Sequence, residues 1–147
     1  MARLLISVAV VVLAGCQTHA AISPAPEPQP ADFGRTVAGA IEVCEPRGER
    51  EYLARLVCPS GQHPTFNRKG SKGSRNPLPV NLSEREEDTL IAALIAGAEV
   101  KPGEPDYHTI DSYEVICGEA KTILYLDMYH CVAPRAEVAP AGFTIVR

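Results

Sequence analysis

The chain has 147 residues, of which 14 are lysine or arginine and 18 are aspartate or glutamate, and its formal net charge is −4. This length fits one small domain. The net acidic balance argues against general binding to nucleic acid.

The first segment of the chain is apolar. Residues 4–13 read LLISVAVVVL and follow a single cation, Arg3. These ten residues are too few for a membrane-spanning helix, which needs about 20, but they match the apolar region of a signal peptide. We therefore expect residues 1–15 to be a signal peptide that directs export.

A cysteine follows this apolar run at once, in the sequence Leu13-Ala14-Gly15-Cys16. The motif resembles the lipobox of bacterial lipoprotein precursors, in which a peptidase cleaves before the cysteine and the thiol receives a diacylglycerol. The resemblance implies that Cys16 becomes a lipid-bearing N-terminus, acylated with chains such as palmitate, which anchor a protein stably when two or more are present. Gln17 in place of aspartate implies the outer membrane of a Gram-negative cell, with the protein facing the periplasm.

Residues 16–32 hold alternating prolines at positions 24, 26, 28 and 30. Each proline fixes its own φ and pushes the preceding residue toward extended geometry, so this segment is predicted to be a semi-rigid spacer. The remaining residues, 33–147, are expected to form a single periplasmic domain.

The domain begins with two β-prone runs, residues 40–44 and 51–58, which flank the turn-rich EPRGER and predict a first hairpin. Residues 83–97 predict an amphipathic helix, because Ser83 and Glu86 form a capping box and Gly97 can close the end. One face of this helix is apolar and is expected to pack against a sheet. Its members are Leu90, Ile91, Leu94 and Ile95.

The C-terminal third contains the longest β-prone runs. Residues 107–117 and 121–131 predict a second hairpin, and residues 143–147 predict a last strand. One helix and about five strands indicate an α+β domain with a small, mainly antiparallel sheet.

Four cysteines remain in the domain, and an even number in an exported small domain indicates two disulfides rather than a zinc site. On an intact hairpin Cys117 and Cys131 would lie about 30 Å apart at roughly 3.3 Å per residue, far beyond the roughly 7 Å limit for a bridge. The same reasoning separates Cys44 from Cys58. Each disulfide is therefore predicted to join the two hairpins, either as Cys44–Cys117 with Cys58–Cys131 or as Cys44–Cys131 with Cys58–Cys117.

Residues 66–75 read FNRKGSKGSR and combine cations with glycine and serine. Such a stretch is typical of an exposed surface loop. A sharper hypothesis is an anion-binding surface, because close backbone amides, hydroxyls and cations together hold phosphate or carboxylate. Its four cations are Arg68, Lys69, Lys72 and Arg75.

Two histidines, His108 and His130, fall near the same end of the predicted second hairpin, with acids including Asp127 around them. Imidazole and carboxylate together can ligate a metal or act as an acid and base pair. A one-residue change in the turn would put the two rings on opposite faces, so satisfied or exposed histidines are the favoured interpretation and no metal is expected.

The function that these features favour is non-enzymatic. No Gly-x-Ser-x-Gly motif is present, and bridged cysteines are not nucleophiles. We expect a binding or accessory role in the cell envelope, as an inhibitor or immunity protein, without a cofactor. The partner would be an envelope protein, peptidoglycan or an anionic lipid. The alternatives are a metal-dependent enzyme that uses His108 and His130, and a structural lipoprotein with no dedicated ligand.

Overall fold

The computed structural model describes residues 30–101, 103–132 and 135–147. The predicted signal peptide, Cys16 and all of the predicted spacer except residues 30–32 lie outside the described residues. Within the described ranges, no helix is both long enough and apolar enough to cross a membrane.

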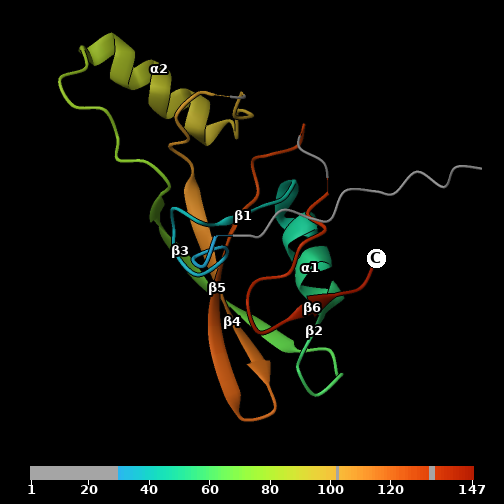
Figure 1. Ribbon diagram of the computed structural model, residues 1–147. Coiled ribbons are helices and arrows are strands. Elements are labelled where there is room, and N and C mark those ends of the chain that lie inside the picture. Colours follow the sequence, from blue (N-terminus) through green and yellow to red (C-terminus); the bar gives the residue numbers. More distant parts are fainter. Residues whose placement is uncertain (1–29, 102, 133–134) are drawn as a thin grey trace, which may run out of the picture.

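The elements in chain order are β1 (Ile41–Glu42), α1 (Glu45–Arg55), β2 (Leu56–Val57), β3 (Thr65–Ser74), α2 (Glu84–Ile95), β4 (Thr109–Cys117), β5 (Ala120–Asp127) and β6 (Thr144–Ile145). One sheet has the strand order β1-β5-β4-β3, and a small second sheet pairs β2 with β6 (Figure 1). Only β1 and β5 run parallel among these pairs. The predicted α+β class with a mainly antiparallel, disulfide-bonded sheet is confirmed, and a second helix is added.

The predicted first hairpin is wrong, because the helix α1 occupies its centre. Pro46 lies in the first turn of α1, where a residue without an N–H is tolerated. Glu49, Tyr52, Leu53 and Leu56 are buried, and their spacing of three and four residues is that of a helix face. Most of the β-prone residues at the end of this run therefore belong to α1, and only the last of them form the short strand β2.

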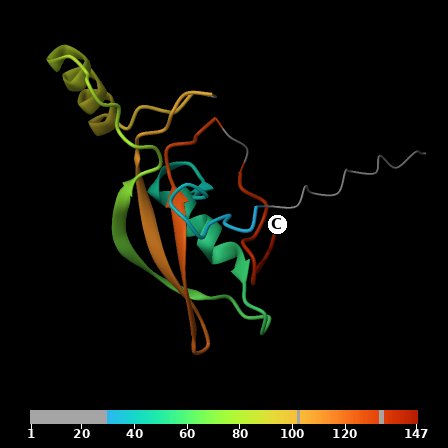
Figure 2. The same cartoon turned by 60° about the vertical axis from the view of Figure 1, so that its left-hand side comes forward.

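The hydrophobic core lies between α1 and one face of the larger sheet (Figure 2). Full burial of a leucine, isoleucine or valine side chain stabilises a fold by roughly 1.5–3 kcal/mol. The buried members of this core are Ile41, Val43, Tyr52, Leu53, Leu56, Tyr113, Val115, Leu124 and Leu126. This packing fixes the sheet against α1 and thereby positions the strand ends that carry the polar residues described below.

The predicted second hairpin is confirmed as β4 and β5. The pairing runs from Asp111 opposite Leu126 to Cys117 opposite Ala120. Gly118 begins the two-residue turn with a φ of 63°, which is a left-handed conformation that suits glycine. Strand β5 ends at Asp127, earlier than predicted, and the predicted last strand is the two-residue β6.

The basic, glycine-rich stretch is an edge strand, β3, rather than the expected loop. It pairs with β4, with register shifts between Arg68 and Gly70 and between Ser71 and Ser74. Gly70 and Gly73 have φ values of 98° and 92°, and glycine at such positions is the usual residue of a β-bulge. Most side chains of β3 are exposed, so no alternating apolar pattern marked it as a strand.

The disulfides are Cys44–Cys131 and Cys58–Cys117. The second of the two predicted pairings is therefore correct, and the pairing Cys44–Cys117 with Cys58–Cys131 is wrong. Cys44 forms a β-bridge with Tyr129 beyond the ends of β1 and β5, which places it beside Cys131. The 11 residues of α1 then carry the chain about 16 Å along the sheet, so that Cys58 reaches the other end, near the hairpin turn.

The second helix, α2, confirms the predicted capping box of Ser83 and Glu86, but it does not pack on the sheet as expected. None of its residues is buried. Figures 1 and 2 show α2 standing away from the sheet at one end of the molecule. We call residues 78–100, which contain α2 and its flanking segments, the arm. Leu90 and Leu94 of its apolar face are half-buried, whereas Ile91 and Ile95 are exposed.

Candidate functional site

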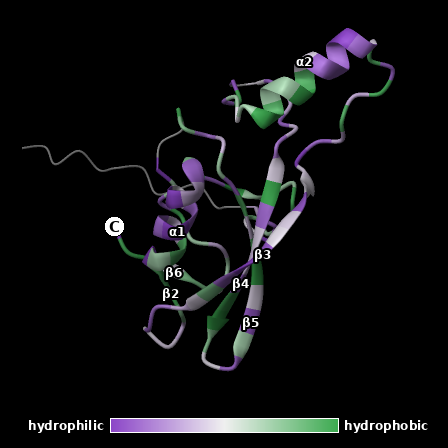
Figure 3. Cartoon of the chain, turned by 180° about the vertical axis from the view of Figure 1, so that it is seen from behind, coloured by the Kyte–Doolittle hydropathy of each residue, from purple (hydrophilic) through white to green (hydrophobic). Residues whose placement is uncertain are grey.

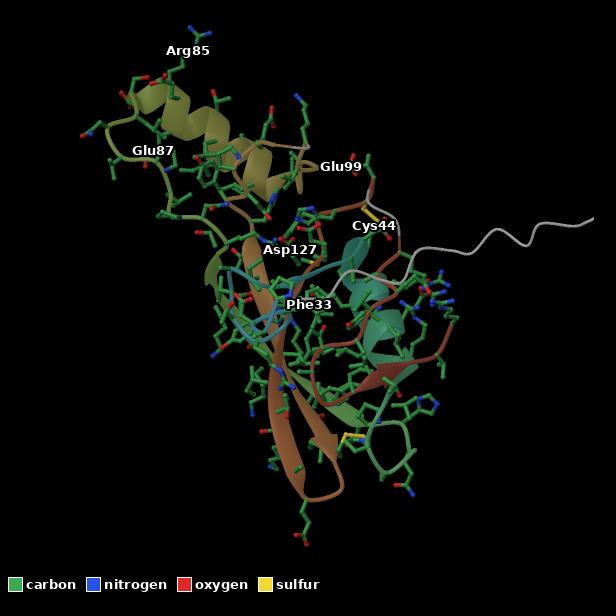
Figure 4. All side chains as sticks on the ribbon, viewed as in Figure 1. Phe33, Cys44, Arg85, Glu87, Glu99 and Asp127 are labelled. Atoms are coloured by element: carbon green, nitrogen blue, oxygen red, sulfur yellow. A yellow bond between two sulfur atoms is a disulfide. The ribbon has the colours of Figure 1, made fainter. Side chains whose placement is uncertain are left out.

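A group of ionisable side chains gathers at the end of the sheet from which the arm projects. Arg75 directly follows β3, Asp106 lies shortly before β4, Asp127 is the last residue of β5, and His130 follows it. Figure 4 labels Asp127 at this end of β5. These four residues, called the acid–histidine cluster below, come together because β3, β4 and β5 are neighbours in one sheet.

Three oxygen and nitrogen atoms converge at the centre of the cluster. His130 Nε2 lies 3.2 Å from Asp106 Oδ2 and 3.0 Å from Asp127 Oδ2. Asp106 and Asp127 are both buried, with exposed fractions of 4% and 0%. Two carboxyl groups are thus removed from water and face one imidazole.

The guanidinium of Arg75 closes one side of the cluster. Its Nη2 lies 3.2 Å from Asp127 Oδ2, and its Nε lies 3.6 Å from Asp106 Oδ2. Nη1 donates to Glu42 Oε1 on β1 at 2.9 Å, and Nη2 donates to the carbonyl of Ala40 at 2.9 Å. Arg75 therefore connects β1 to the two buried aspartates.

Outer hydrogen bonds fix the orientation of the two aspartates, and a carboxylate faces the outer nitrogen of the histidine. Asp106 Oδ1 accepts from the backbone N–H of His108 at 2.8 Å and lies 3.0 Å from the Nδ1 of the same residue. The backbone N–H of Tyr129 donates to Asp127 Oδ1 at 3.2 Å. His130 Nδ1 lies 3.6 Å from Glu42 Oε2. As a result, Oδ2 of each aspartate and Nε2 of the histidine point inward.

The environment of the cluster shifts the pKa values of its ionisable groups in different directions. A hydrogen bond with Asp127, opposed by burial, raises the pKa of His130. Burial raises the pKa of Asp127, and the neighbouring Asp106 raises it further. Burial works against ionisation of Asp106 too, but hydrogen bonds from Asp127, His108 and His130 keep the pKa of Asp106 below its usual value. Asp106 is thus the more acidic carboxyl group, and His130 favours the protonated form.

The two predicted histidines meet on opposite sides of Asp106. His108 contacts Oδ1 and stacks on the ring of Tyr129 at a centroid distance of 3.9 Å, whereas His130 faces Oδ2. Neither Glu42 nor the role of Arg75 was predicted, because neither residue is near the hairpin in the sequence. Pairing of β1 with β5 and of β3 with β4 brings both residues there.

The predicted anion-binding set is divided between several environments. Arg68 pairs with the buried Asp111 through Nε and Nη2, the latter at 2.7 Å, and Arg75 belongs to the acid–histidine cluster. Lys69 and Lys72 are exposed and form no ion pair with any described residue. Two of the four cations thus already face internal carboxylates, and anion binding by this set stays a prediction.

A further buried carboxyl group, Glu49, lies on the core face of α1. Its Oε2 accepts from the hydroxyl of Tyr113 at 2.8 Å, and its Oε1 has no hydrogen-bond partner among the described residues. Burial raises the pKa of Glu49 to about 7, although the hydrogen bond from Tyr113 lowers it. The folded protein therefore holds a proton on Glu49 at acidic pH values where the unfolded chain releases it.

This raised pKa predicts that the free energy of unfolding falls by about 3 kcal/mol as the pH rises from below about 4.5 to above about 7. The native state binds more protons than the unfolded state between these values, so a higher pH favours unfolding. Glu49→Gln keeps a partner for Tyr113 without titrating and should remove this contribution, while the raised pKa of His130 leaves its own decline in both proteins. Urea unfolding at about pH 5 and about pH 8 measures how far the free energy of unfolding falls in the wild type and in Glu49→Gln.

Glu51→Gln is the matched control, because Glu51 is an exposed carboxylate on the same helix. We expect this variant to keep the decline of the wild type. If Glu49→Gln kept the whole decline as well, burial of Glu49 would not be its source.

No family model matches this chain, and neither a curated protein nor a solved structure is significantly similar to it. The fold and the site define it as a small disulfide-bonded α+β domain with a buried acid–histidine cluster and a projecting helix.

Proposed function

We propose that this protein is an exported bacterial lipoprotein that is anchored through Cys16 in the outer membrane and binds a partner protein of the cell envelope through its arm. The lipobox resemblance of residues 13–16 supports the anchor. Alternating prolines in residues 16–32 support a spacer that holds the domain away from the membrane surface. An inhibitor or immunity protein is the form of binding function that fits such a tethered domain.

The observation that carries the proposal is the apolar surface of the arm. Leu78, Val80, Ile91 and Ile95 have exposed fractions of 55%, 81%, 45% and 83%. Figure 3 shows that the apolar residues of α2 gather toward its C-terminal half, whereas the outer half is hydrophilic. Contiguous exposed apolar surface on a soluble domain marks an interaction site.

The charge of the arm indicates what kind of partner fits it. Residues 78–100 carry five carboxylates and one guanidinium, so the arm alone has a net charge of −4, as large as that of the entire chain. Figure 4 shows Arg85, Glu87 and Glu99 of this segment. An apolar surface with an acidic rim is complementary to a protein that presents an apolar patch with a basic rim. Anionic lipid headgroups and a second copy of the arm would both be repelled.

Replacement of Cys16 by serine is expected to release the protein from the membrane. The serine variant has no thiol for a diacylglycerol, so it should move from the membrane fraction to the periplasmic fraction. Mass spectrometry of the N-terminal peptide should find acyl chains on the wild type alone. An unacylated wild type that still sediments with membranes would contradict lipid anchoring.

Replacement of Ile91 and Ile95 together by serine is expected to reduce binding of the envelope partner at least about tenfold, which corresponds to about 1.4 kcal/mol. The two side chains supply the most apolar exposed part of α2, and truncation of central apolar contacts removes a large part of binding energy. The tagged full chain is used to capture partners from envelope extract, and the captured protein is quantified.

Ile123→Ser is the matched control, because Ile123 is an exposed isoleucine, at 38%, on β5 rather than on the arm. A second variant, Glu87→Lys with Asp88→Lys, retains the capping box and reverses two charges of the acidic rim. We expect capture to survive the control and to be lost in both arm variants. Equal capture by all variants, binding to anionic vesicles, or self-association through the arm would overturn the proposal.

A further inference from the structure

We propose that Asp106, Asp127 and His130 form a binding site for a divalent transition-metal ion, with zinc as the best chemical match. This site is independent of the arm and goes beyond the proposed partner binding. It uses His130 and Asp127 directly and gives His108 the role of orienting a ligand rather than of a ligand.

The first support is the spacing of the inward-pointing atoms. Asp106, Asp127 and His130 each offer one ligand atom, and these atoms all lie within 4.8 Å of one another. His130 Nε2 is 3.2 Å and 3.0 Å from the two Oδ2 atoms. Ligands at about 2.0–2.1 Å from a tetrahedral zinc ion lie roughly 3.3 Å apart, so the two observed separations already approach those around such an ion.

The second support is the set of outer contacts, which is that of a metal site. Metal-binding histidines commonly direct their other ring nitrogen to a carboxylate, and ligating carboxylates are in turn hydrogen-bonded. His130 directs Nδ1 toward Glu42, and Asp106 is held by His108 through its other oxygen. Asp127 is held by the N–H of Tyr129. Each aspartate thus has one oxygen facing the centre and another held by a hydrogen bond from outside, and the outer nitrogen of His130 faces a carboxylate at 3.6 Å.

Arg75 faces the same two oxygens and must share them with the ion. The carboxylates of Glu42, Asp106 and Asp127 together carry three negative charges, and both Arg75 and His130 contact all three. A divalent ion that binds Nε2 displaces the proton of His130, and the ion, Arg75 and the three carboxylates then have a net charge of zero. Arg75 would keep its contacts with Glu42 and Ala40 while the ion takes the inner oxygens.

The ligand types select the class of ion. Two carboxylates and one imidazole suit zinc and the neighbouring first-row ions, whereas calcium and magnesium prefer all-oxygen surroundings. Three protein ligands leave one position of a tetrahedral ion open. One surface pocket is lined by His130 and another by Glu42 and Arg75, whereas Asp106 and Asp127 line neither and are buried.

The test is zinc binding by the full chain carrying Cys16→Ser, which changes no described residue. After treatment with a chelator and dialysis, calorimetric titration with zinc alone should show saturable binding of one ion per chain. His130→Gln should weaken the affinity at least about a hundredfold. His108→Gln should weaken it by about ten- to a hundredfold, as expected for loss of an orienting contact.

His63→Gln is the control, because His63 is an exposed histidine whose Nδ1 lies 2.8 Å from the carbonyl oxygen of Leu56, outside the cluster. The zinc affinity of this variant should equal that of the Cys16→Ser chain with all of its histidines intact. Backbone amide NMR spectra with and without zinc locate the ion without any histidine substitution, and the shifts should concentrate at Asp106, Asp127 and His130. No saturable binding, or shifts centred on the acidic arm instead, would overturn the proposal.

Discussion

Replacement of Arg75 by methionine is expected to lower the free energy of unfolding by about 3 kcal/mol in metal-free buffer, because two buried carboxyl groups lose a neighbouring cation. Asp127 is fully buried and Asp106 nearly so, and neither can recover its hydration in the folded state. Methionine keeps much of the apolar stem of arginine, which limits the loss of packing. Urea unfolding in the presence of a chelator measures the difference.

Arg47→Met is the matched control for this prediction. Arg47 pairs with Glu51 at 2.6 Å, but its side chain is 80% exposed. An exposed pair of this kind four residues apart on a helix contributes only about 0.3–0.5 kcal/mol. Equal losses in Arg47→Met and Arg75→Met would show that the buried aspartates do not depend on Arg75.

Removal of the Cys58–Cys117 disulfide by double replacement with serine is expected to cost about 4 kcal/mol. The two cysteines are separated by 59 residues, and the loop-closure estimate for a loop of that length gives this magnitude. Cys58 is buried, so two serine hydroxyls would also replace an apolar bridge. A loss of this size is a large part of the roughly 5–15 kcal/mol that stabilises a typical domain.

The comparison with Cys16→Ser makes this measurement specific, because that variant also lacks a cysteine but retains both disulfides of the domain. We expect Cys16→Ser to unfold at the wild-type denaturant concentration, whereas Cys58→Ser with Cys117→Ser unfolds at a much lower one. A loss below about 1 kcal/mol in the double variant would contradict a role for this disulfide in stability.

The fold class followed from the sequence because the strongest local signals are also the ones that tertiary packing uses. The β4–β5 hairpin has long β-prone runs and a glycine turn, and α2 has a capping box. The helix α1 was missed because its C-terminal residues are β-prone and its turn-rich start resembles a hairpin loop. The buried face of α1 contains Glu49, Tyr52 and Leu53. This helical pattern can be recognised in the sequence only if Glu49, a charged residue type, is counted among the core residues.

The candidate site was only partly predictable for a different reason. His108, His130 and Asp127 are near one another along the hairpin, so their proximity was open to inference from strand pairing. Glu42 and Arg75 reach the cluster through the partners of β1 and β3 in the sheet. That information is non-local, and β3 itself lacks an apolar pattern because it is an exposed edge strand.

For the arm, the local structure was predictable from the sequence and the packing was not. Its helix was predicted correctly, but packing of its apolar face on the sheet was expected and is not found. Amphipathicity shows that a helix has a surface to cover and does not show what covers it. The exposed Ile91 and Ile95 are therefore the reason to propose a binding role for this part of the chain.

The most direct test of partner binding by the arm is photo-crosslinking in the cells that produce the protein, with the photoreactive residue at position 95 or, for comparison, at position 123. We predict a discrete adduct with another envelope protein from position 95 that is lost when Glu87 and Asp88 are changed to lysine. Position 123 should give no such adduct. The same adduct from both positions, an adduct with a second copy of the chain, or no adduct from position 95 would contradict the proposed function.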